Sequence, residues 1–140
     1  MGPVGTRDDP RPAARAAGLL LVDAANVIGS RPDGWWRDRA GAARVLVDRL
    51  RQAVRNGALD APVVVVLEGA GRAGAGELEW GGVRVVHAAS TGDDALVELA
   101  TGEEGSVTLV SADRALAARI SGARVRGPSW LLGRLGAASE

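Results

Sequence analysis

The sequence has no cysteine, lysine, phenylalanine or tyrosine, and each absence narrows what the protein can be. Without Cys the chain forms no disulfide, no thiolate nucleophile and no thiolate-bound zinc site, a composition that fits a reducing cytosol. Trp is the only aromatic residue type, so the core has to be built from Val, Leu and Ala. Because Lys is absent, all 17 basic residues are Arg, and together with the 20 Gly this indicates the codon bias of a GC-rich, bacterial-type genome.

An excess of charge of either sign is also missing. Asp and Glu together number 17, so the formal net charge at pH 7 is zero and the pI is about 6.6. The chain therefore lacks the global basic field of many nucleic-acid-binding proteins, and any such binding has to be local. No apolar run is long enough to cross a membrane and no apolar signal segment is visible, so we expect a cytoplasmic protein that does not bind membranes.

The length of 140 residues predicts one domain. Residues 1–17 mix Pro, Arg, Asp and Ala without apolar periodicity, which predicts a flexible tail. We place the domain at 18–136 and a short C-terminal tail at 137–140.

Apolar runs alternate with amphipathic segments throughout this domain. The predicted strands are 19–22, 63–67, 83–87, 107–110 and 124–126, and the predicted helices are 36–55, 91–100, 113–120 and 128–135. Turn-rich residues 29–34 and glycine-rich residues 69–76 are predicted to be loops. Strands alternating with helices indicate a three-layer α/β fold, with a mostly parallel sheet of about five strands and helices on both faces.

Acidic residues follow four of the predicted strands. Asp23 ends the first strand, Glu68 the second, Asp93 and Asp94 come after the third, and Asp113 after the fourth. Because the carboxyl ends of parallel strands meet at one edge, we expect these side chains to lie close together. Clustered carboxylates repel one another and need a cation, and hard oxygen ligands without Cys favour Mg²⁺ or Mn²⁺.

Each acid also has a purely structural interpretation. Asp93, Asp94 and Asp113 stand in first helical turns, where carboxylates cap free backbone amides. Glu68 fits the first solvated residue after a strand. Asp23 is harder to explain in this way, because a carboxylate that closes an apolar strand is costly unless something pairs with it.

Three short blocks resemble the motifs of the NYN branch of the PIN-like nuclease superfamily. They are Leu21–Val27 (LVDAANV), Gly92–Val97 (GDDALV) and Leu109–Arg114 (LVSADR), in the order typical of that family. The resemblance implies a Rossmann-like PIN fold and a divalent-metal-dependent ribonuclease.

The resemblance also implies roles for individual residues. Asp23 matches the first metal ligand, Asp113 the third acid, and either Asp93 or Asp94 the second, because the motif fits in either register. We therefore expect catalysis to involve these four acids, and metal binding to involve Asp23, Asp94 and Asp113, with Asp93 and Glu68 as further candidates. Asn26 would hold the loop or a ligand water, and Ser111 would lie beside Asp113.

Substrate contacts are expected in the loops at the same edge. Trp35 and Trp36 are adjacent indoles at a loop-to-helix junction and cannot both enter one core, so one is a candidate for stacking on a base; the alternative is that both pack locally. Arginines there can bind phosphates bidentately. The expected contacts are Asn26, Arg31, Trp35, Trp36, Arg37, Ser111 and Arg114.

The function predicted from the sequence is hydrolysis of RNA phosphodiester bonds with Mg²⁺ or Mn²⁺ as cofactor. Single-stranded or structured RNA is the expected partner, with the ribosome as a further candidate, and the chain is expected to be a monomer or a homodimer. Two alternatives stay open. One is a small-molecule phosphohydrolase, such as a nucleoside-triphosphate pyrophosphohydrolase, that uses the same metal site, and the other is a non-catalytic RNA-binding or ribosome-associated PIN-like module.

Overall fold

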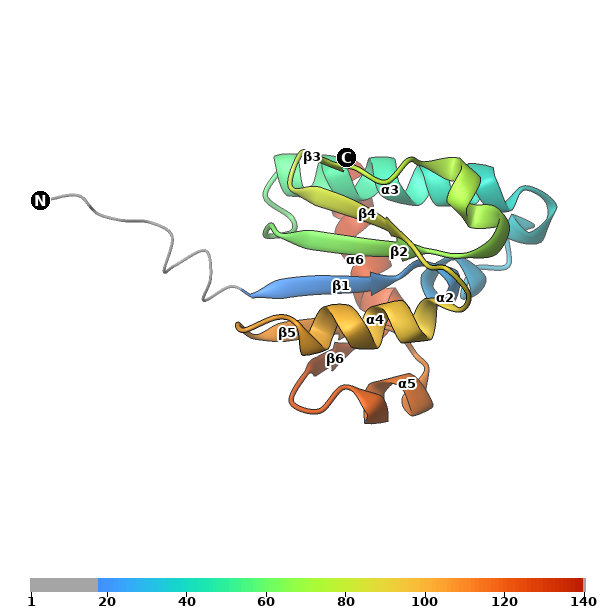
Figure 1. Cartoon of the computed structure of the whole chain (residues 1–140). Helices are drawn as coiled ribbons and strands as arrows, with labels where there is room; N and C mark the ends of the chain where they lie inside the picture. The colour runs from blue at the N-terminus through green and yellow to red at the C-terminus, as the bar shows by residue number, and fades with distance from the viewer. Residues whose placement is uncertain (1–17, 140) are drawn as a thin grey trace, which may run out of the picture.

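Five parallel strands and one short antiparallel strand form the sheet of the computed structural model, which describes residues 18–139 (Figure 1). Their order across the sheet is β3-β4-β2-β1-β5-β6, and β3 pairs antiparallel with β4. The strands are β1 (Leu19–Asp23), β2 (Val63–Leu67), β3 (Glu79–Trp80), β4 (Val83–His87), β5 (Val107–Val110) and β6 (Arg124–Arg126). The predicted tail 1–17 lies outside the described residues.

Helices cover both faces of the sheet, as the three-layer prediction requires. They are α2 (Ala24–Gly29), α3 (Arg39–Arg55), α4 (Gly92–Thr101), α5 (Arg114–Arg119) and α6 (Pro128–Ser139), with 3-10 turns η1 (Trp35–Arg37) and η2 (Gly69–Gly74). In Figure 1, α4 lies in front of the sheet and α6 behind it. Among the described residues, no helix has both the length and the apolarity needed to cross a bilayer.

Two apolar cores lie on the two sides of the sheet. Leu20 and Val22 of β1 face the core that contains Leu50 of α3 and Leu131 of α6. The alternate residues of β1 and β2 face the opposite core, which α4 and α5 complete with Leu96 and Leu116. Every residue of β1 and β2 is buried, which explains why these strands are apolar runs without polar alternation.

The structure differs from the sequence prediction around the first loop. The chain does not enter this loop directly from β1, because Asp23 caps the six-residue helix α2 first. The long helix α3 begins at Arg39 instead of residue 36, since the carboxylate Oδ1 of Asp38 accepts a hydrogen bond of 2.8 Å from the Gly41 N–H and caps the helix there. Trp35 and Trp36 therefore belong to the separate turn η1.

Smaller differences affect other elements. The two-residue strand β3 lies within a segment without apolar alternation, and both of its residues are exposed, so no pattern signals it. The predicted loop 69–76 contains the 3-10 turn η2. The last helix continues to Ser139, four residues beyond its predicted end at Leu135.

The strand order determines where a ligand can enter. From β1 the chain moves to β2 and then β4 on one side, and it returns to β5 on the other side of β1. The order therefore reverses at β1, and open parallel sheets bind ligands beyond the carboxyl ends of the strands at such a reversal. Asp23 is the last residue of β1.

Candidate active site

Asp23 is a buried carboxylate held by two hydrogen bonds. Only 5% of its surface is exposed. Its Oδ2 accepts a hydrogen bond of 2.9 Å from the Ser111 hydroxyl, and its Oδ1 accepts one of 3.3 Å from the Asn26 N–H, which caps α2. These bonds fix the direction of the carboxylate before any ligand binds.

The surroundings of Asp23 disfavour the ionised form of its carboxyl group. Burial raises the pKa of the Asp23 carboxyl above its usual value, the hydrogen bonds from Ser111 and Asn26 oppose this shift, and the negative charges of Asp93 and Glu68 add to it. The two other acids that act on Asp23 are therefore Asp93 and Glu68. A buried acid with a raised pKa at a ligand crevice is typical of functional sites.

Asn26 and Ser111 join two sequence blocks that lie far apart along the chain. The side-chain Oδ1 of Asn26 accepts a hydrogen bond of 2.7 Å from the Ala112 N–H. This bond attaches the loop between β5 and α5 to α2. The Ser111 hydroxyl donates to Asp23 and accepts a hydrogen bond of 3.1 Å from the Asp113 N–H. One hydroxyl thus uses its single proton for Asp23, and its orientation is determined.

Glu68 lies half-buried at the end of β2 and caps α4. Its Oε1 accepts a hydrogen bond of 3.1 Å from the Gly92 N–H. Thr91 is the N-cap residue of α4, but its side chain forms no capping bond. A Cβ on Gly92 would lie 2.6 Å from Glu68 Oε1, so glycine is what allows the carboxylate to come this close. Glu68 is therefore fixed between β2 and α4, within the field of Asp23.

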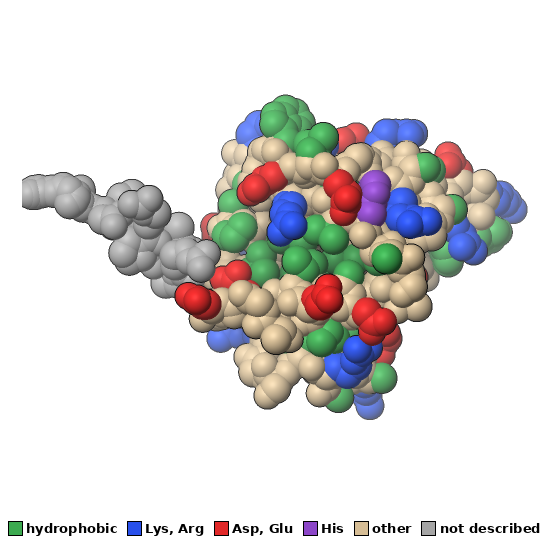
Figure 2. All heavy atoms as spheres, in the orientation of Figure 1, with side chains coloured by type: hydrophobic (Ala, Val, Ile, Leu, Met, Phe, Trp, Pro, Cys, Tyr) green, Lys and Arg blue, Asp and Glu red, His purple; other side chains and the backbone are tan. Residues whose placement is uncertain are grey.

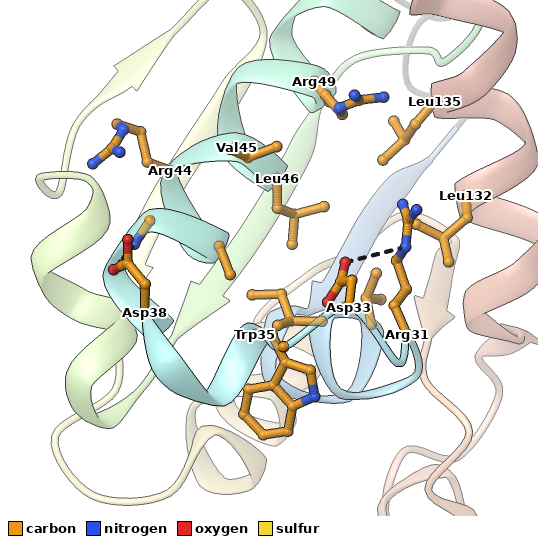
Figure 3. Close-up of a pocket in the computed structure, with 15 residues that line it drawn as sticks. Arg31, Asp33, Trp35, Asp38, Arg44, Val45, Leu46, Arg49, Leu132 and Leu135 are labelled. Carbon is orange, nitrogen blue, oxygen red and sulfur yellow. Dashed lines mark hydrogen bonds and ion pairs between the residues drawn. The ribbon is translucent and has the colours of Figure 1, made fainter.

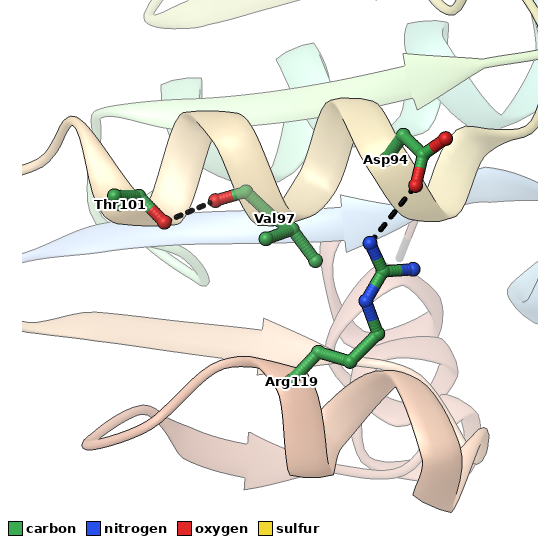
Figure 4. Close-up of polar contacts among 4 residues, drawn as sticks. All are labelled: Asp94, Val97, Thr101 and Arg119. Atoms are coloured by element: carbon green, nitrogen blue, oxygen red, sulfur yellow. Dashed lines mark hydrogen bonds and ion pairs between the residues drawn. The ribbon is translucent and has the colours of Figure 1, made fainter.

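Asp93 and Asp94 point in different directions, although the sequence does not distinguish them. The exposed Asp94 accepts a hydrogen bond of 2.9 Å from Arg119 Nη2 of α5, as Figure 4 shows. Asp93 is half-buried and its charge acts on Asp23. The ion pair of Asp94 with Arg119 and the effect of Asp93 on the pKa of Asp23 thus favour Asp93 as the acid of this block that belongs to the site.

Asp113 caps α5 through a hydrogen bond of 3.0 Å from the Leu116 N–H to its Oδ1. The capping interpretation of this residue is therefore seen in the structure. Its own N–H is bonded to Ser111, which keeps its backbone next to the partner of Asp23.

The side chains do not enclose a metal site as they stand. Within residues 18–139, no three His, Asp or Glu side chains lie close enough together to hold a metal ion. The donor set itself fits a hard divalent cation, because Asp23, Asp93 and Glu68 offer carboxylate oxygens and the charges of Asp93 and Glu68 raise the pKa of Asp23. None of the three forms an ion pair within the described part of the chain.

The tryptophan pair lies in the turn η1, where Trp35 lines a cavity together with Ala24 and Glu68. The rings of Trp35 and Trp36 meet edge to face, with centroids 6.1 Å apart and planes at 85°. Trp36 is 54% exposed and the Arg37 guanidinium lies 5.8 Å from its ring, whereas Trp35 is half-buried and has Arg39 at 5.3 Å. The two indoles do not pack into one common core, and an arginine guanidinium lies near each ring.

The other predicted contact residues lie at the surface, and Arg31 lines the hollow between α2, α3 and α6 (Figure 3) rather than the site of Asp23. Arg31 forms an exposed ion pair of 3.5 Å with Asp33, and Arg114 is the exposed first residue of α5. Arg119, the partner of Asp94, was not predicted from the sequence because nothing in the α5 segment indicates that it faces α4. Acidic and basic side chains are interspersed on the face drawn in Figure 2, in agreement with the balanced net charge.

Comparison with known proteins gives the fold. No protein-family model matches the chain, and no curated protein sequence does either. The crystal structure of Rae1 (YacP) from Bacillus subtilis is similar, with a TM-score of 0.68 and 20% sequence identity over 86% of this chain and 75% of that one. A single-residue variant of the same protein gives a TM-score of 0.64 with 20% identity, over 86% and 76% of the two chains. The predicted α/β class is confirmed, and the chain has a NYN/PIN-like fold.

Proposed function

We propose that this protein is a divalent-metal-dependent ribonuclease that hydrolyses RNA phosphodiester bonds beside Asp23. The observation that carries the proposal is the environment of this residue: a buried carboxylate, oriented by Ser111 and Asn26, within the field of Asp93 and Glu68 at the reversal of strand order. The NYN/PIN-like fold supports it, because the three sequence blocks that resemble this nuclease branch meet at this edge.

Asp23 and Asp93 are the residues we propose as primary ligands of Mg²⁺ or Mn²⁺, with Glu68 adding negative charge. Among the other predicted ligands we rank Asp113 above Asp94, because Asp113 is bonded to Ser111 whereas Asp94 is engaged with Arg119. When bound, the ion would activate water and neutralise charge on the phosphate. Ser111 and Asn26 keep the Asp23 carboxylate in one orientation, so no reorganisation is needed at the moment of reaction.

Binding of RNA is proposed to use local cations at the surface. Trp36 is exposed enough to stack on a base, and Arg37, Arg31 and Arg114 are exposed enough to reach phosphates. Because the net charge is zero, this patch has to supply the attraction that a global field supplies in other RNA-binding proteins.

One observation favours a second candidate, a non-catalytic RNA-binding module. The described side chains do not enclose a metal ion. Such a module would bind RNA through the same surface with no divalent-metal requirement and would leave it intact.

The decisive experiment is RNA cleavage by the full chain in millimolar Mn²⁺ or Mg²⁺. We expect cleavage that is lost on chelation and reduced at least about a hundredfold in Asp23→Asn, the scale of losing a metal ligand or its orienting shell. Asp60→Asn is the matched control, since Asp60 precedes β2 at the opposite end of the sheet and is exposed.

The same preparations separate the alternatives. Hydrolysis of nucleoside triphosphates that depends on Asp23, without cleavage of RNA, would replace the ribonuclease by a small-molecule phosphohydrolase. Binding of RNA without any Asp23-dependent hydrolysis would support the non-catalytic module.

A further inference from the structure

A groove runs along β4 on the side of the sheet that carries α4. Two cavities, of about 380 Å³ and about 600 Å³, form this groove, and both have Arg84, Glu98 and Leu99 in their walls. The first cavity also contains Leu19 at the start of β1, and the second contains Thr91 before α4. The groove therefore extends from the amino end of the sheet to its carboxyl end.

The floor of the groove is apolar, because α4 packs over β1 and β2 and leaves β4 partly open. Leu96 of α4 belongs to one core with Val64 and Val66 of β2, whereas Val86 of β4 and Leu99 of α4 are only partly buried beside that core. In Figure 1, β2 and β4 lie in open view beside α4, and Figure 2 shows apolar side chains at the surface in the middle of this face. A hollowed apolar surface with charged residues around it is typical of an interaction site.

Carboxylates dominate the charged residues of this groove. Glu79, Glu98 and Glu103 line the cavity at the amino end, where Arg84 is the only basic residue among the described lining residues. Arg84 lies opposite Glu79 in the pairing of β3 with β4, but neither forms an ion pair within the described part of the chain. The excess of negative charge disfavours the phosphates of RNA at this surface and favours a basic ligand.

The chain carries a segment of this chemistry immediately before the described residues. Residues 10–17, with the sequence PRPAARAA, contain Arg11 and Arg15 and no acid, and the acids Asp8 and Asp9 come earlier in the sequence. The other residues of the segment are Pro and Ala. They are apolar, and Pro suits an extended chain that lies on a surface without joining a β-ladder.

This segment joins the domain at the amino end of the groove. Leu19 lines the groove, and Gly18 before it has φ +80°, so the backbone departs from strand geometry at this point. A Cβ on Gly18 would clash with Ser106, so glycine is required there. At about 3.3 Å per extended residue, Arg15 can reach up to roughly 13 Å from Leu19 and Arg11 up to roughly 26 Å, and β4 is itself only about 13 Å long. The segment is therefore long enough to follow β4 from one end to the other.

We propose that residues 10–17 of this chain bind in the groove beside β4, with Arg11 and Arg15 next to the carboxylates of Glu79 and Glu98. Because the segment is linked to Gly18, its effective concentration at the groove exceeds that of a free basic peptide. The bound segment covers the apolar floor that α4 leaves open. The inference does not depend on the proposed function, since neither RNA nor a metal ion enters it.

The test uses the full chain, in which the absence of cysteine allows a label at one chosen position. Ala13→Cys is labelled with a nitroxide, and the amide signals of the isotope-labelled protein are recorded by nuclear magnetic resonance before and after reduction of the label. We expect the oxidised label to broaden the signals of Arg84, Val86 and Leu99. The signal of Asp48 should keep its intensity, because α3 packs on the opposite face of the sheet.

Charge reversals then show which residues hold the segment. Glu98→Arg should remove most of the broadening, because it replaces an attractive carboxylate by a guanidinium that repels Arg15. Adding Arg15→Glu to Glu98→Arg should restore the broadening. Asp48→Arg is the matched control, since it makes the same change of charge at an exposed residue on the opposite face, and it should leave the broadening unchanged. Far-ultraviolet circular dichroism and the Tm establish that each variant is folded.

Three results would overturn the assignment. One is a label that leaves the signals of the groove as sharp as that of Asp48, and another is a folded Glu98→Arg variant that keeps the broadening of the wild-type groove. The third comes from a mixture of nitroxide-labelled chains without isotope and isotope-labelled chains without nitroxide. Broadening of the groove signals in this mixture would assign the groove to a second copy of the chain. RNA cleavage that depends on Asp23 changes none of these outcomes, so failure here and failure of the proposed function are distinguishable.

Discussion

At the scale of single residues, the site consists of the Asp23 carboxylate and the two groups that donate hydrogen bonds to it. The chain places Asp23 where its charge is disfavoured by burial and by two neighbouring acids, and it compensates with bonds from Ser111 and Asn26. The compensation is incomplete, since the pKa of Asp23 stays raised. The charged form of Asp23 is therefore electrostatically disfavoured in the folded protein, and a bound cation would stabilise it.

The first prediction concerns the pH dependence of stability. Because the folded-state pKa of Asp23 lies above the usual value of 3.8, the folded protein binds this proton more tightly than the unfolded chain. Its contribution to the free energy of unfolding is therefore full below pH 3.8 and is lost as pH rises through the raised pKa. We expect metal-free Asp23→Asn to be more stable than wild type at pH 7, and to lack this loss, in urea unfolding between pH 4 and pH 8. A variant that is less stable than wild type at pH 7 would contradict the prediction.

The second prediction concerns the donor of the strongest bond to Asp23. Ser111→Ala removes the hydroxyl and leaves a buried carboxylate oxygen without its partner, which we expect to lower the free energy of unfolding by about 1–3 kcal/mol at pH 7. It should also raise the pKa of Asp23 further, so the destabilisation should shrink toward pH 4. Ser90→Ala is the control in both urea series, because Ser90 is an exposed residue before α4. Equal losses at both pH values would show that packing, and not the charge, is what Ser111 supports.

At the scale of elements, the site is built from junctions between strands and helices. Asp23 caps α2, Asp113 caps α5, and Glu68 reaches from the end of β2 to cap α4. The acids are thus structural caps and candidate functional groups at once. The two interpretations offered by the sequence do not exclude each other.

A third prediction follows for α4. Glu68→Ala should lower the free energy of unfolding by about 1 kcal/mol, the typical contribution of an N-cap, because the Gly92 N–H loses its acceptor. Glu68→Gln keeps an oxygen acceptor and should cost less. Thr91→Ala should be nearly neutral, since the Thr91 side chain forms no capping bond. Thermal unfolding of the three variants decides the matter, and a Thr91→Ala variant as unstable as Glu68→Ala would show that the local capping pattern holds the helix after all.

These elements also show what the sequence can and cannot predict. The strands β1 and β2 are predicted because burial on both faces demands apolar runs, and the end of β1 marks Asp23. The sequence cannot choose between Asp93 and Asp94, because adjacent helical residues point about 100° apart and the docking of α4 decides which one faces Asp23. The capping of α4 by Glu68 is equally hidden, since it joins residues 24 positions apart.

At the scale of the whole molecule, the topology brings these junctions to one place. The return of the chain to β5 beside β1 places Ser111 against Asp23, although 88 positions separate them. The net charge is zero and the surface charges are interspersed. The exposed Trp36 with the Arg37 guanidinium beside it is therefore a local feature of the surface. The residues of the proposed site are therefore concentrated at one edge of the sheet, and contacts between distant parts of the chain hold that edge in position.

The last prediction tests whether that edge takes a metal at all. If Asp23, Asp93 and Glu68 are held together against their mutual repulsion, a divalent cation should bind the folded chain far better than the unfolded one and stabilise it. At a Mn²⁺ concentration about a hundred times the Kd, we expect the Tm to rise by roughly 10 °C, the shift that linkage predicts for a domain of this size. Asp23→Asn should lose this response, whereas Asp60→Asn should keep it, because Asp60 is at the other end of the sheet. A non-catalytic RNA-binding module needs no cation. A wild-type Tm that Mn²⁺ leaves unchanged would therefore count against both hydrolytic functions, and it would agree with the absence, within the described residues, of three acidic side chains placed to hold a metal ion.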